Sequence, residues 1–174
     1  YLPHTGGVTL QALHVEAKAL AEPIRSDRPR WITYGSSITQ CAAADSPALT
    51  WPAIVARKMQ WDLTCLGFAG QCHAEPLVAR VIRDLPADVI SLCLGINIQI
   101  LASMNLRTFR PAVIGMIAMI REKHANTPII VMSPIISPPR ETTENAVGMT
   151  LQMMRDELRD VVHLLCSRGD KHLY

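Results

Sequence analysis

The 174-residue sequence lacks the features of several common protein classes. No uninterrupted apolar run approaches the roughly 18 residues that a membrane-spanning helix needs, and no basic run of five residues occurs. The formal net charge is only +2, which argues against a nucleic-acid or membrane-surface partner. The zinc pattern HExxH and the phosphate-binding patterns GxxxxGK and GxGxxG are also missing. We therefore predict no metal site, no cofactor, no nucleic-acid partner and no transmembrane segment.

Cysteine pairs at metal-binding or redox spacing are missing as well. The five cysteines form an odd set without CxxC spacing: Cys41, Cys65, Cys72, Cys93 and Cys166. This pattern argues against a disulfide framework and a zinc site, and it favours a reducing compartment such as the cytoplasm. A single disulfide in an exported protein stays open, as does a targeting segment, because the chain opens at Tyr1 without Met.

The sequence has a large apolar fraction, and its patterns divide the chain into two parts. Hydrophobic residues make up 49% and charged residues 18%, so a sizeable core is expected. Residues 8–15 alternate imperfectly and predict a strand, and the polar stretch 23–30 with two prolines is typical of a linker. We expect residues 1–28 to be an N-terminal strand and linker, the tail of a preceding β-domain, and residues 29–174 to form the main domain.

The main domain alternates strand and helix patterns. Strands are predicted at 31–35, 62–67, 88–95 and 127–133, and helices at 51–59, 76–85, 109–124 and 151–166. The proline-rich stretch 134–145 is expected to be a surface loop or lid, and residues 172–174 could begin a fifth strand. Such alternation predicts an α/β fold, a three-layer α/β/α flavodoxin-like sandwich with a central parallel sheet, here with a short N-terminal β segment added.

Two of these helices carry apolar residues at helical spacing. For helix 51–59 the N-cap is Thr50, and the predicted apolar face is Trp51, Ile54, Val55 and Met59. For helix 76–85 the predicted apolar face is Leu77, Val78, Val81, Ile82 and Leu85.

Three strand-to-helix loops carry related chemistry. In a parallel sheet these loops emerge at one edge, the edge where ligands bind in α/β proteins. The loops offer Gly35-Ser36-Ser37, Gly67-Phe68-Ala69-Gly70 and Gly95-Ile96-Asn97. A hydroxyl, a glycine amide and a carboxamide are the groups that acyl transfer needs: a nucleophile, and N–H donors for the oxyanion of the tetrahedral intermediate.

With these motifs the chain resembles the SGNH hydrolases, the GDSL-type esterases and lipases, over residues 30–170. The family's Gly-Asp-Ser-Leu/Ile-Thr motif aligns with residues 35–39, and the resemblance puts the nucleophile on Ser37. The family's second-block glycine falls on Gly70 and its Gly-x-Asn on residues 95–97, which makes Gly70 and Asn97 oxyanion donors. Two departures stand out: Ser36 replaces the Asp that shapes the turn, and the Asn before the second-block glycine is absent.

The resemblance implies a serine esterase that forms an acyl-enzyme on Ser37. Ser36, Gly95 and His73 are expected to line the substrate pocket. The substrate would be a small-molecule or carbohydrate ester, and a preceding β-domain would suggest O-acetyl groups on sugars. One alternative is a non-catalytic ligand-binding module on the same fold. Another is a nucleotide-binding flavodoxin-like protein, which the missing phosphate loops disfavour.

The general base is the part of the triad that the sequence does not supply clearly. The family's Asp-x-x-His spacing occurs at Asp160 and His163, but in an apolar helical pattern, away from the predicted edge. His73 lies at the predicted edge and is a candidate substitute base, whereas His14 and His124 are expected at the surface. We expect the chain to end before the Asp/His block, so that residues 29–174 form a domain truncated at its C-terminus.

Overall fold

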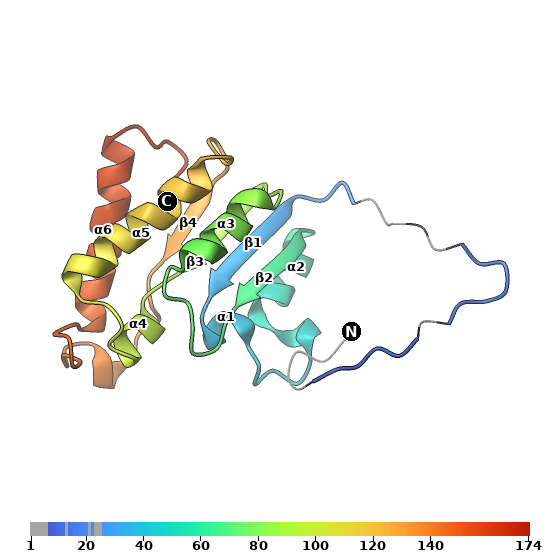
Figure 1. Cartoon of the computed structure of the whole chain (residues 1–174), viewed down its shortest axis with the longest axis horizontal. Coiled ribbons are helices and arrows are strands. Elements are labelled where there is room, and N and C mark those ends of the chain that lie inside the picture. The colour runs from blue at the N-terminus through green and yellow to red at the C-terminus, as the bar shows by residue number, and fades with distance from the viewer. Residues whose placement is uncertain (1–6, 13, 21, 23–25) are drawn as a thin grey trace.

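The organising element is a four-stranded parallel sheet, seen in a computed structural model that describes residues 7–12, 14–20, 22 and 26–174. The strand order is β2-β1-β3-β4. The strands are β1 (Arg30–Gly35), β2 (Asp62–Gly67), β3 (Val89–Cys93) and β4 (Ile129–Met132). All pairings are parallel, so the strands end at one common edge, which we call the carboxyl edge (Figure 1).

Helices cover both faces of this sheet. They are α1 (Ser37–Gln40), α2 (Trp51–Met59), α3 (Pro76–Asp84), α4 (Ile96–Ile100), α5 (Leu106–Arg121) and α6 (Leu151–Ser167), with 3₁₀ turns η1 (Pro47–Leu49) and η2 (Pro138–Arg140). Helices α3, α5 and α6 lie side by side over one face, and α1 and α2 belong to the other (Figure 1). The predicted α/β/α sandwich is confirmed.

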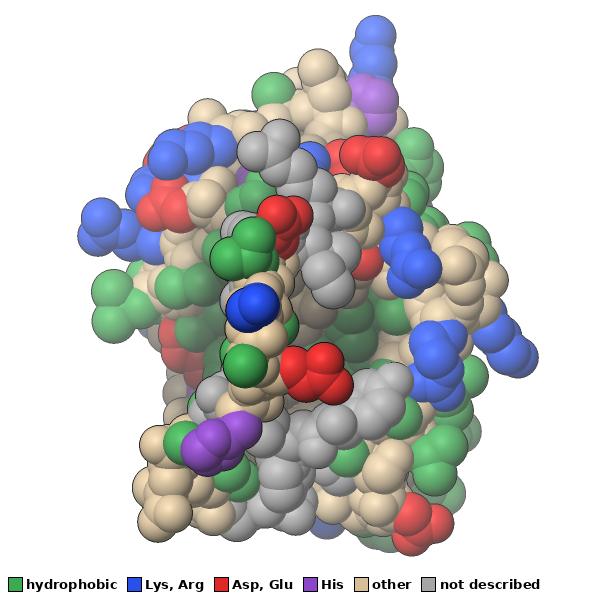
Figure 2. Space-filling view, turned by 90° about the vertical axis from the view of Figure 1, so that its right-hand side faces the viewer, with side chains coloured by type: hydrophobic (Ala, Val, Ile, Leu, Met, Phe, Trp, Pro, Cys, Tyr) green, Lys and Arg blue, Asp and Glu red, His purple; other side chains and the backbone are tan. Residues whose placement is uncertain are grey.

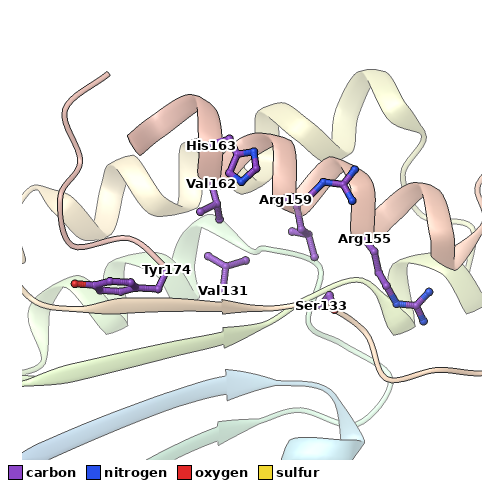
Figure 3. A pocket seen from close by; sticks show the side chains of 8 residues that line it. Val131, Ser133, Arg155, Arg159, Val162, His163 and Tyr174 are labelled. Carbon is purple, nitrogen blue, oxygen red and sulfur yellow. The ribbon is translucent and has the colours of Figure 1, made fainter. Parts of the chain in front are cut away.

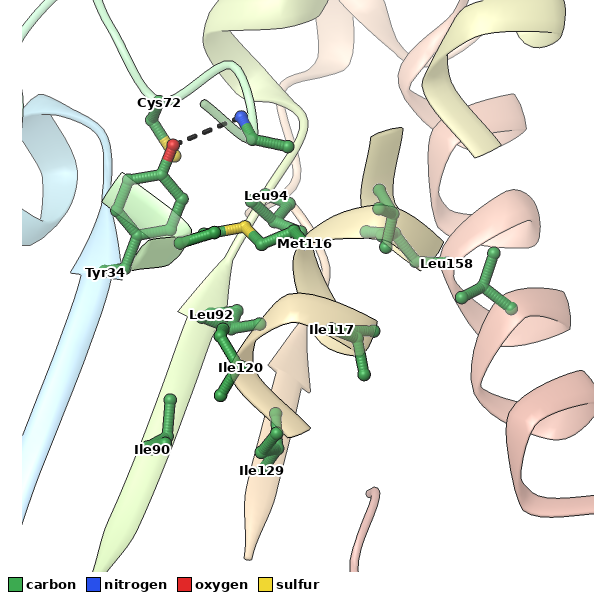
Figure 4. Packing of buried hydrophobic residues seen from close by; sticks show 14 of the residues in the cluster. Tyr34, Cys72, Ile90, Leu92, Leu94, Met116, Ile117, Ile120, Ile129 and Leu158 are labelled. Carbon is green, nitrogen blue, oxygen red and sulfur yellow. Dashed lines mark hydrogen bonds between the residues drawn. The ribbon is translucent and has the colours of Figure 1, made fainter. Parts of the chain in front are cut away.

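The alternation of side chains along the strands separates two packing zones. Ile32, Tyr34, Ile90 and Leu92 are at most 1% exposed and meet α3, α5 and α6 in the main core (Figure 4). On the other face, the Trp31 ring lies with its centroid 5.9 Å from those of Trp51 and Trp61. Both faces of the sheet are therefore covered near β1, as expected for a parallel sheet.

Most predicted elements are confirmed, with shifted ends. Thr50 caps α2, because its hydroxyl accepts a hydrogen bond from the Ala53 N–H at 3.4 Å. Helix α5 begins at Leu106, three residues before the predicted start, because Asn105 and Thr108 form a capping box there. Leu173 pairs with Ile129 in a parallel bridge beside β4, as the predicted start of a fifth strand requires.

The apolar faces of α2 and α3 are only partly buried. Leu77 and Val81 are 74% and 47% exposed, whereas Ala79 and Ile82 are buried. Met59 is 52% exposed. The apolar stripe of α3 is wider than its contact with the sheet and α5, and periodicity alone does not show which part of such a stripe meets a neighbour.

The strand predicted at residues 8–15 is absent from the described residues, and Leu13 lies outside them. Val8, Leu10 and Val15 are 49–69% exposed, and the described residues of this segment extend away from the sheet (Figure 1). An extended segment needs a paired neighbour to form a strand, and the structure offers none here. Among the described residues, the first helix or strand is β1, which starts at Arg30. That residues 1–28 belong to a preceding β-domain stays a prediction.

Side chains of both charge signs occur on the face drawn in Figure 2. Within the described part of the chain, no helix combines the length and the apolar character that a membrane span requires.

Candidate active site

The turn from β1 into α1 presents Ser37. Ser36 is the N-cap of α1: its backbone is extended, and its hydroxyl accepts a hydrogen bond from the Ile38 N–H at 3.2 Å. Ser36 is 1% exposed, whereas Ser37, the first residue of the helix, is exposed. Serine and aspartate are both strong N-caps, so Ser36 can shape this turn in place of an aspartate. The turn directs one hydroxyl inward as a cap and leaves the other accessible.

Two glycines let α1 lie directly on the ends of β1 and β2. A Cβ added at Gly35 would lie 2.8 Å from Thr39 Cβ, and one added at Gly67 would lie 2.6 Å from Gln40 Cα. Real Cβ atoms do not approach other heavy atoms so closely. These two positions therefore need glycine for close approach, and that approach holds Ser37 at the carboxyl edge.

The loop after β2 has an unusual backbone. Gly70, Cys72 and Ala74 all have positive φ, at 69°, 76° and 56°. This conformation costs little for glycine and of order 1–3 kcal/mol for other residues, and it clusters at functional sites. A Cβ at Gly70 would meet nothing within 4 Å, so the predicted oxyanion glycine lies in an open part of the loop.

Tyr34 and Glu75 hold this loop in place. The Glu75 carboxylate accepts hydrogen bonds from the Tyr34 hydroxyl and from the backbone N–H groups of Cys72 (3.0 Å) and His73 (2.8 Å). The Ala74 N–H donates to the Tyr34 oxygen at 3.2 Å (Figure 4). We call these residues the Tyr34–Glu75 network. It ties the end of β1, just before the Ser36–Ser37 turn, to the loop that carries Gly70.

Sequence reasoning missed this network. The available signals were a buried tyrosine, whose hydroxyl usually finds a partner, and an acidic residue directly before the proline that starts α3.

Burial shapes the ionisation of the network. Burial raises the pKa of Tyr34, and the neighbouring Cys72 and Glu75 raise it further, so this hydroxyl stays protonated and donates. Burial by itself would raise the pKa of Glu75, but the hydrogen bonds from Tyr34, His73 and Cys72 hold it below its usual value. Burial raises the pKa of Cys72 to about 12, which leaves a neutral thiol and no nucleophile there.

The loop after β3 brings Asn97 against the loop after β2. Gly95 caps the short helix α4 with φ 117°, and a Cβ there would lie 3.0 Å from the Pro134 ring. Asn97 is 7% exposed, and its side-chain amide donates to the Gln71 carbonyl oxygen, next to Gly70. An amide carries two N–H groups, so one is left for a ligand.

Backbone contacts complete the connection between the three loops. The Phe68 N–H donates to the carbonyl oxygen of Gly35, the last residue of β1, at 2.8 Å, which joins the end of β1 to the loop after β2. Together with the bond between Asn97 and Gln71, it makes the loops that carry Ser37, Gly70 and Asn97 a continuous set. The roles assigned to these three residues, and to Ser36 and Gly95 in the pocket, stay predictions.

His73 is at the carboxyl edge, and both of its ring nitrogens have partners. Nε2 lies 3.4 Å from the Gly70 carbonyl oxygen and Nδ1 lies 2.7 Å from Ser103 Oγ. A carbonyl only accepts, so in the neutral ring Nε2 carries the proton and Nδ1 accepts from Ser103. Both partners are groups other than Ser37, so this geometry does not favour His73 as a base.

Asp160 and His163 lie elsewhere. They belong to α6, which starts at the carboxyl edge and runs away from it. His163 is twelve residues beyond Leu151, about 18 Å along the helix at 1.5 Å per residue. His163 faces a groove between α6 and β4, together with Val131 and Tyr174 (Figure 3).

His124 also lies away from the carboxyl edge, near the C-terminal end of α3. His124, expected at the surface, is 7% exposed, because Nε2 contacts the carbonyl oxygens of Ile82 and Leu85 at 3.2 and 3.1 Å. Among the described histidines, His73 is the only one in a strand-to-helix loop at the carboxyl edge.

The loop after β4 is anchored rather than loose. Arg155 on α6 forms an ion pair with Glu141 and donates to the Pro134 carbonyl oxygen at 3.2 Å. Asn145 donates to the Gln99 carbonyl oxygen at 2.7 Å. No three His, Cys, Asp or Glu side chains within the described ranges gather closely enough to hold a metal ion.

Comparison with known proteins gives a family match and several similar folds. The model of the GDSL-like lipase/acylhydrolase family matches residues 28–174. No match was found among curated protein sequences. The salicylyl-acyltransferase SsfX3, from a tetracycline biosynthetic pathway, is 36% identical with a TM-score of 0.80, over 88% of this chain and 43% of that one.

Two further structures are similar. One, from Bacteroides ovatus and named for its likeness to GDSL lipases, is 27% identical with a TM-score of 0.70, over 84% of this chain and 42% of that one. The other, a family two carbohydrate esterase from Clostridium thermocellum, is 18% identical with a TM-score of 0.69, over 89% of this chain and 55% of that one. At this identity the likeness shows the fold alone. The chain thus spans less than half the length of the first two proteins.

Proposed function

Because the chain belongs to the GDSL-like lipase/acylhydrolase family, we propose that it cleaves a carboxylic ester through an acyl-enzyme on Ser37. The observation that carries the proposal is the continuous set of three loops. An exposed serine, an open glycine and a nearly buried asparagine follow the ends of three adjacent parallel strands. Hydrogen bonds from Phe68 to Gly35, the last residue of β1, and from Asn97 to Gln71 connect these segments.

In the proposed reaction, Ser37 Oγ attacks the ester carbonyl carbon and its proton passes to a general base. The Ser37 N–H, the Gly70 N–H and the second N–H of Asn97 hold the oxyanion. The first N–H groups of a helix have no intrahelical acceptor, so the Ser37 N–H is available. Collapse of the tetrahedral intermediate breaks the bond to the alcohol oxygen, which leaves with the proton. Water then releases the acid and restores Ser37.

The general base is assigned to neither His73 nor His163. His73 has partners for both ring nitrogens, and His163 lies far along α6. A general base contributes typically about 10²–10⁴-fold to such a reaction. The chain of 174 residues is therefore expected to hydrolyse esters slowly, at a rate that an external base increases.

The same observation favours a second candidate, a ligand-binding module that keeps the pocket but carries out no chemistry. For the substrate, O-acylated carbohydrates are one proposed class. Transfer of the acyl group to an alcohol other than water is the related possibility that the likeness to SsfX3 supports.

The test measures hydrolysis of p-nitrophenyl acetate, with and without imidazole, by the wild type, Ser37→Ala and the control Ser167→Ala. Ser167 is exposed at the end of α6. Imidazole alone cleaves this ester, so the rate measured without protein is subtracted at each imidazole concentration. The remaining, protein-dependent rate should increase with imidazole for the wild type and the control but not for Ser37→Ala. Mass mapping after treatment with a fluorophosphonate should find the label on Ser37.

The Asn97→Ala variant extends this test to the oxyanion site. It should reduce the imidazole-supported rate about 10²–10³-fold, the usual effect of losing one donor. If neither hydrolysis nor labelling depends on Ser37, the enzyme proposal is refuted and the binding module takes its place.

A further inference from the structure

A cavity of about 550 Å³ opens beside the proposed active site. It lies between the loop after β2 with the first residue of α3, the turn before α5, and residues 111–119 of α5. His73 and Glu75 form one wall, and Met104, Gly115, Met116 and Met119 are among the residues opposite. His73 follows Gly70 by three residues, and its Nε2 lies 3.4 Å from the Gly70 carbonyl oxygen. The volume is within the roughly 300–1,000 Å³ of small-molecule pockets.

The lining suits an uncharged, apolar occupant. Three methionines contribute flexible thioether side chains, which adapt to irregular apolar shapes. Among the described residues that line the cavity, Glu75 is the only acid, and its carboxylate is engaged by the Tyr34 hydroxyl and the N–H groups of Cys72 and His73. A charged ligand would give up its water here without gaining a partner.

Gly115 is an exposed residue of the lining, and its lack of a side chain leaves this part of the cavity open. It lies in the middle of the 16-residue helix α5, where glycine weakens a helix relative to alanine. Its φ is not positive, and an added Cβ would meet nothing within 4 Å. Neither backbone conformation nor close packing therefore calls for glycine at this position. Instead its missing side chain widens the cavity.

We infer that this cavity holds the apolar acyl group of the ester substrate, an inference that rests on the proposed function. The alcohol has to leave beside a group that returns a proton to it. Within the described lining only His73 and Glu75 could carry a proton, and both are held by other partners. The acyl group needs no proton, and its carbonyl would be bound at Gly70, on the same loop that forms the wall. An acyl chain much larger than acetyl fits this volume.

The first experiment fills the cavity by substitution. Gly115→Leu adds a strong helix former that projects into the space, Gly115→Ala adds one methyl group, and Ala118→Leu places the same bulk at an exposed position of α5 outside the lining. The ratio of kcat/KM for p-nitrophenyl octanoate to that for p-nitrophenyl acetate is measured in the presence of imidazole. Removing room for even one methylene costs about tenfold or more in an apolar pocket.

Gly115→Leu should therefore reduce this ratio at least tenfold and Gly115→Ala less, while Ala118→Leu retains the wild-type ratio. An unchanged ratio in folded Gly115→Leu would overturn the inference and leave the proposed function standing. The inference would also be overturned, with the proposed function still standing, if Gly115→Leu impaired the hydrolysis of octyl acetate rather than that of p-nitrophenyl octanoate. In that case the cavity would hold the alcohol.

A binding measurement separates the two proposals. The uncharged ketone 2-decanone, which cannot be hydrolysed, is titrated calorimetrically into the Ser37→Ala variant and into Ser37→Ala/Gly115→Leu. Binding that weakens at least tenfold in the double variant supports the cavity even if the protein hydrolyses no ester. Equal affinity for both variants, or no binding by either, refutes the inference.

Discussion

The Tyr34–Glu75 network makes a quantitative prediction about stability. Glu75→Gln keeps the shape of the side chain and one oxygen, but puts an N–H₂ group where a second acceptor was. The carboxylate accepts from the Tyr34 hydroxyl and from two backbone N–H groups at 2.8 and 3.0 Å, and Tyr34 is fully buried. The amide can accept on one side only, so at least one donor loses its partner.

The size of the effect follows from the kind of hydrogen bond that is lost. A hydrogen bond to a charged group contributes about 1.5–3 kcal/mol, and we expect Glu75→Gln to reduce the free energy of unfolding by about 2 kcal/mol at pH 7. Tyr34→Phe removes the same bond from the other side and should cost a similar amount. Because one bond is lost in both variants, the double variant should be less destabilised than the sum, by about 1–2 kcal/mol.

The pH dependence gives the network a second signature. The pKa of Glu75 in the folded protein lies below its ordinary value of 4.5. A carboxylate whose pKa is lowered on folding stabilises the fold fully above its unfolded pKa, and this contribution disappears as the pH falls through the folded pKa. The stability difference between wild type and Glu75→Gln should therefore be constant above about pH 5 and shrink below about pH 4.5.

Urea unfolding followed by tryptophan fluorescence measures both effects. The control is Glu144→Gln, an exposed glutamate in the loop after β4, which should change stability by less than about 0.5 kcal/mol. The reasoning is refuted if Glu75→Gln behaves like this control, or if its effect is the same at pH 3.5 and pH 7.

Three further predictions concern close packing, helix capping and burial. Gly67→Ala should destabilise the protein by about 2 kcal/mol or more, because the new methyl group would collide with the Gln40 backbone. Urea unfolding measures this loss, and an unchanged unfolding midpoint would contradict the close packing of α1. Ser36→Ala should cost about 1 kcal/mol through the lost N-cap while Ser36→Asp retains the cap, so equal unfolding midpoints for the two variants would rule out the capping role. Iodoacetamide at pH 8 should modify the exposed Cys166 and leave Cys72 unmodified, because Cys72 is 2% exposed and its pKa is raised to about 12. Mass mapping identifies the labelled cysteine. Rapid labelling of Cys72 in the folded protein would refute its burial.

The sequence by itself determined the layout of the fold. Strand and helix patterns alternate, and each of these is a local property that depends on side chains a few residues apart. The parallel sheet and its common edge follow from that alternation through the handedness of the crossovers. The positions of Ser37, Gly70 and Asn97 after three successive strands could therefore be predicted before any contact was known, as could the Thr50 cap.

Only the tertiary structure decided what those side chains meet. Leu77 and Ala79 are both apolar helix residues, and the packing of α3 buries only the second. The bond between Tyr34 and Glu75 spans 41 residues, and that between Asn97 and Gln71 spans 26. The burial of His124 depends in the same way on carbonyl groups about 40 residues earlier.

These contacts join residues that are far apart in the sequence. They are favoured because buried polar groups need hydrogen-bond partners and because apolar groups gain free energy when they leave water. A sequence pattern records which side chains can make such contacts, but not which partners the fold brings within reach. For this protein the residues that follow the strand ends are visible in the sequence, whereas the hydrogen bonds of His73 and the apolar cavity beside it are properties of the folded chain alone.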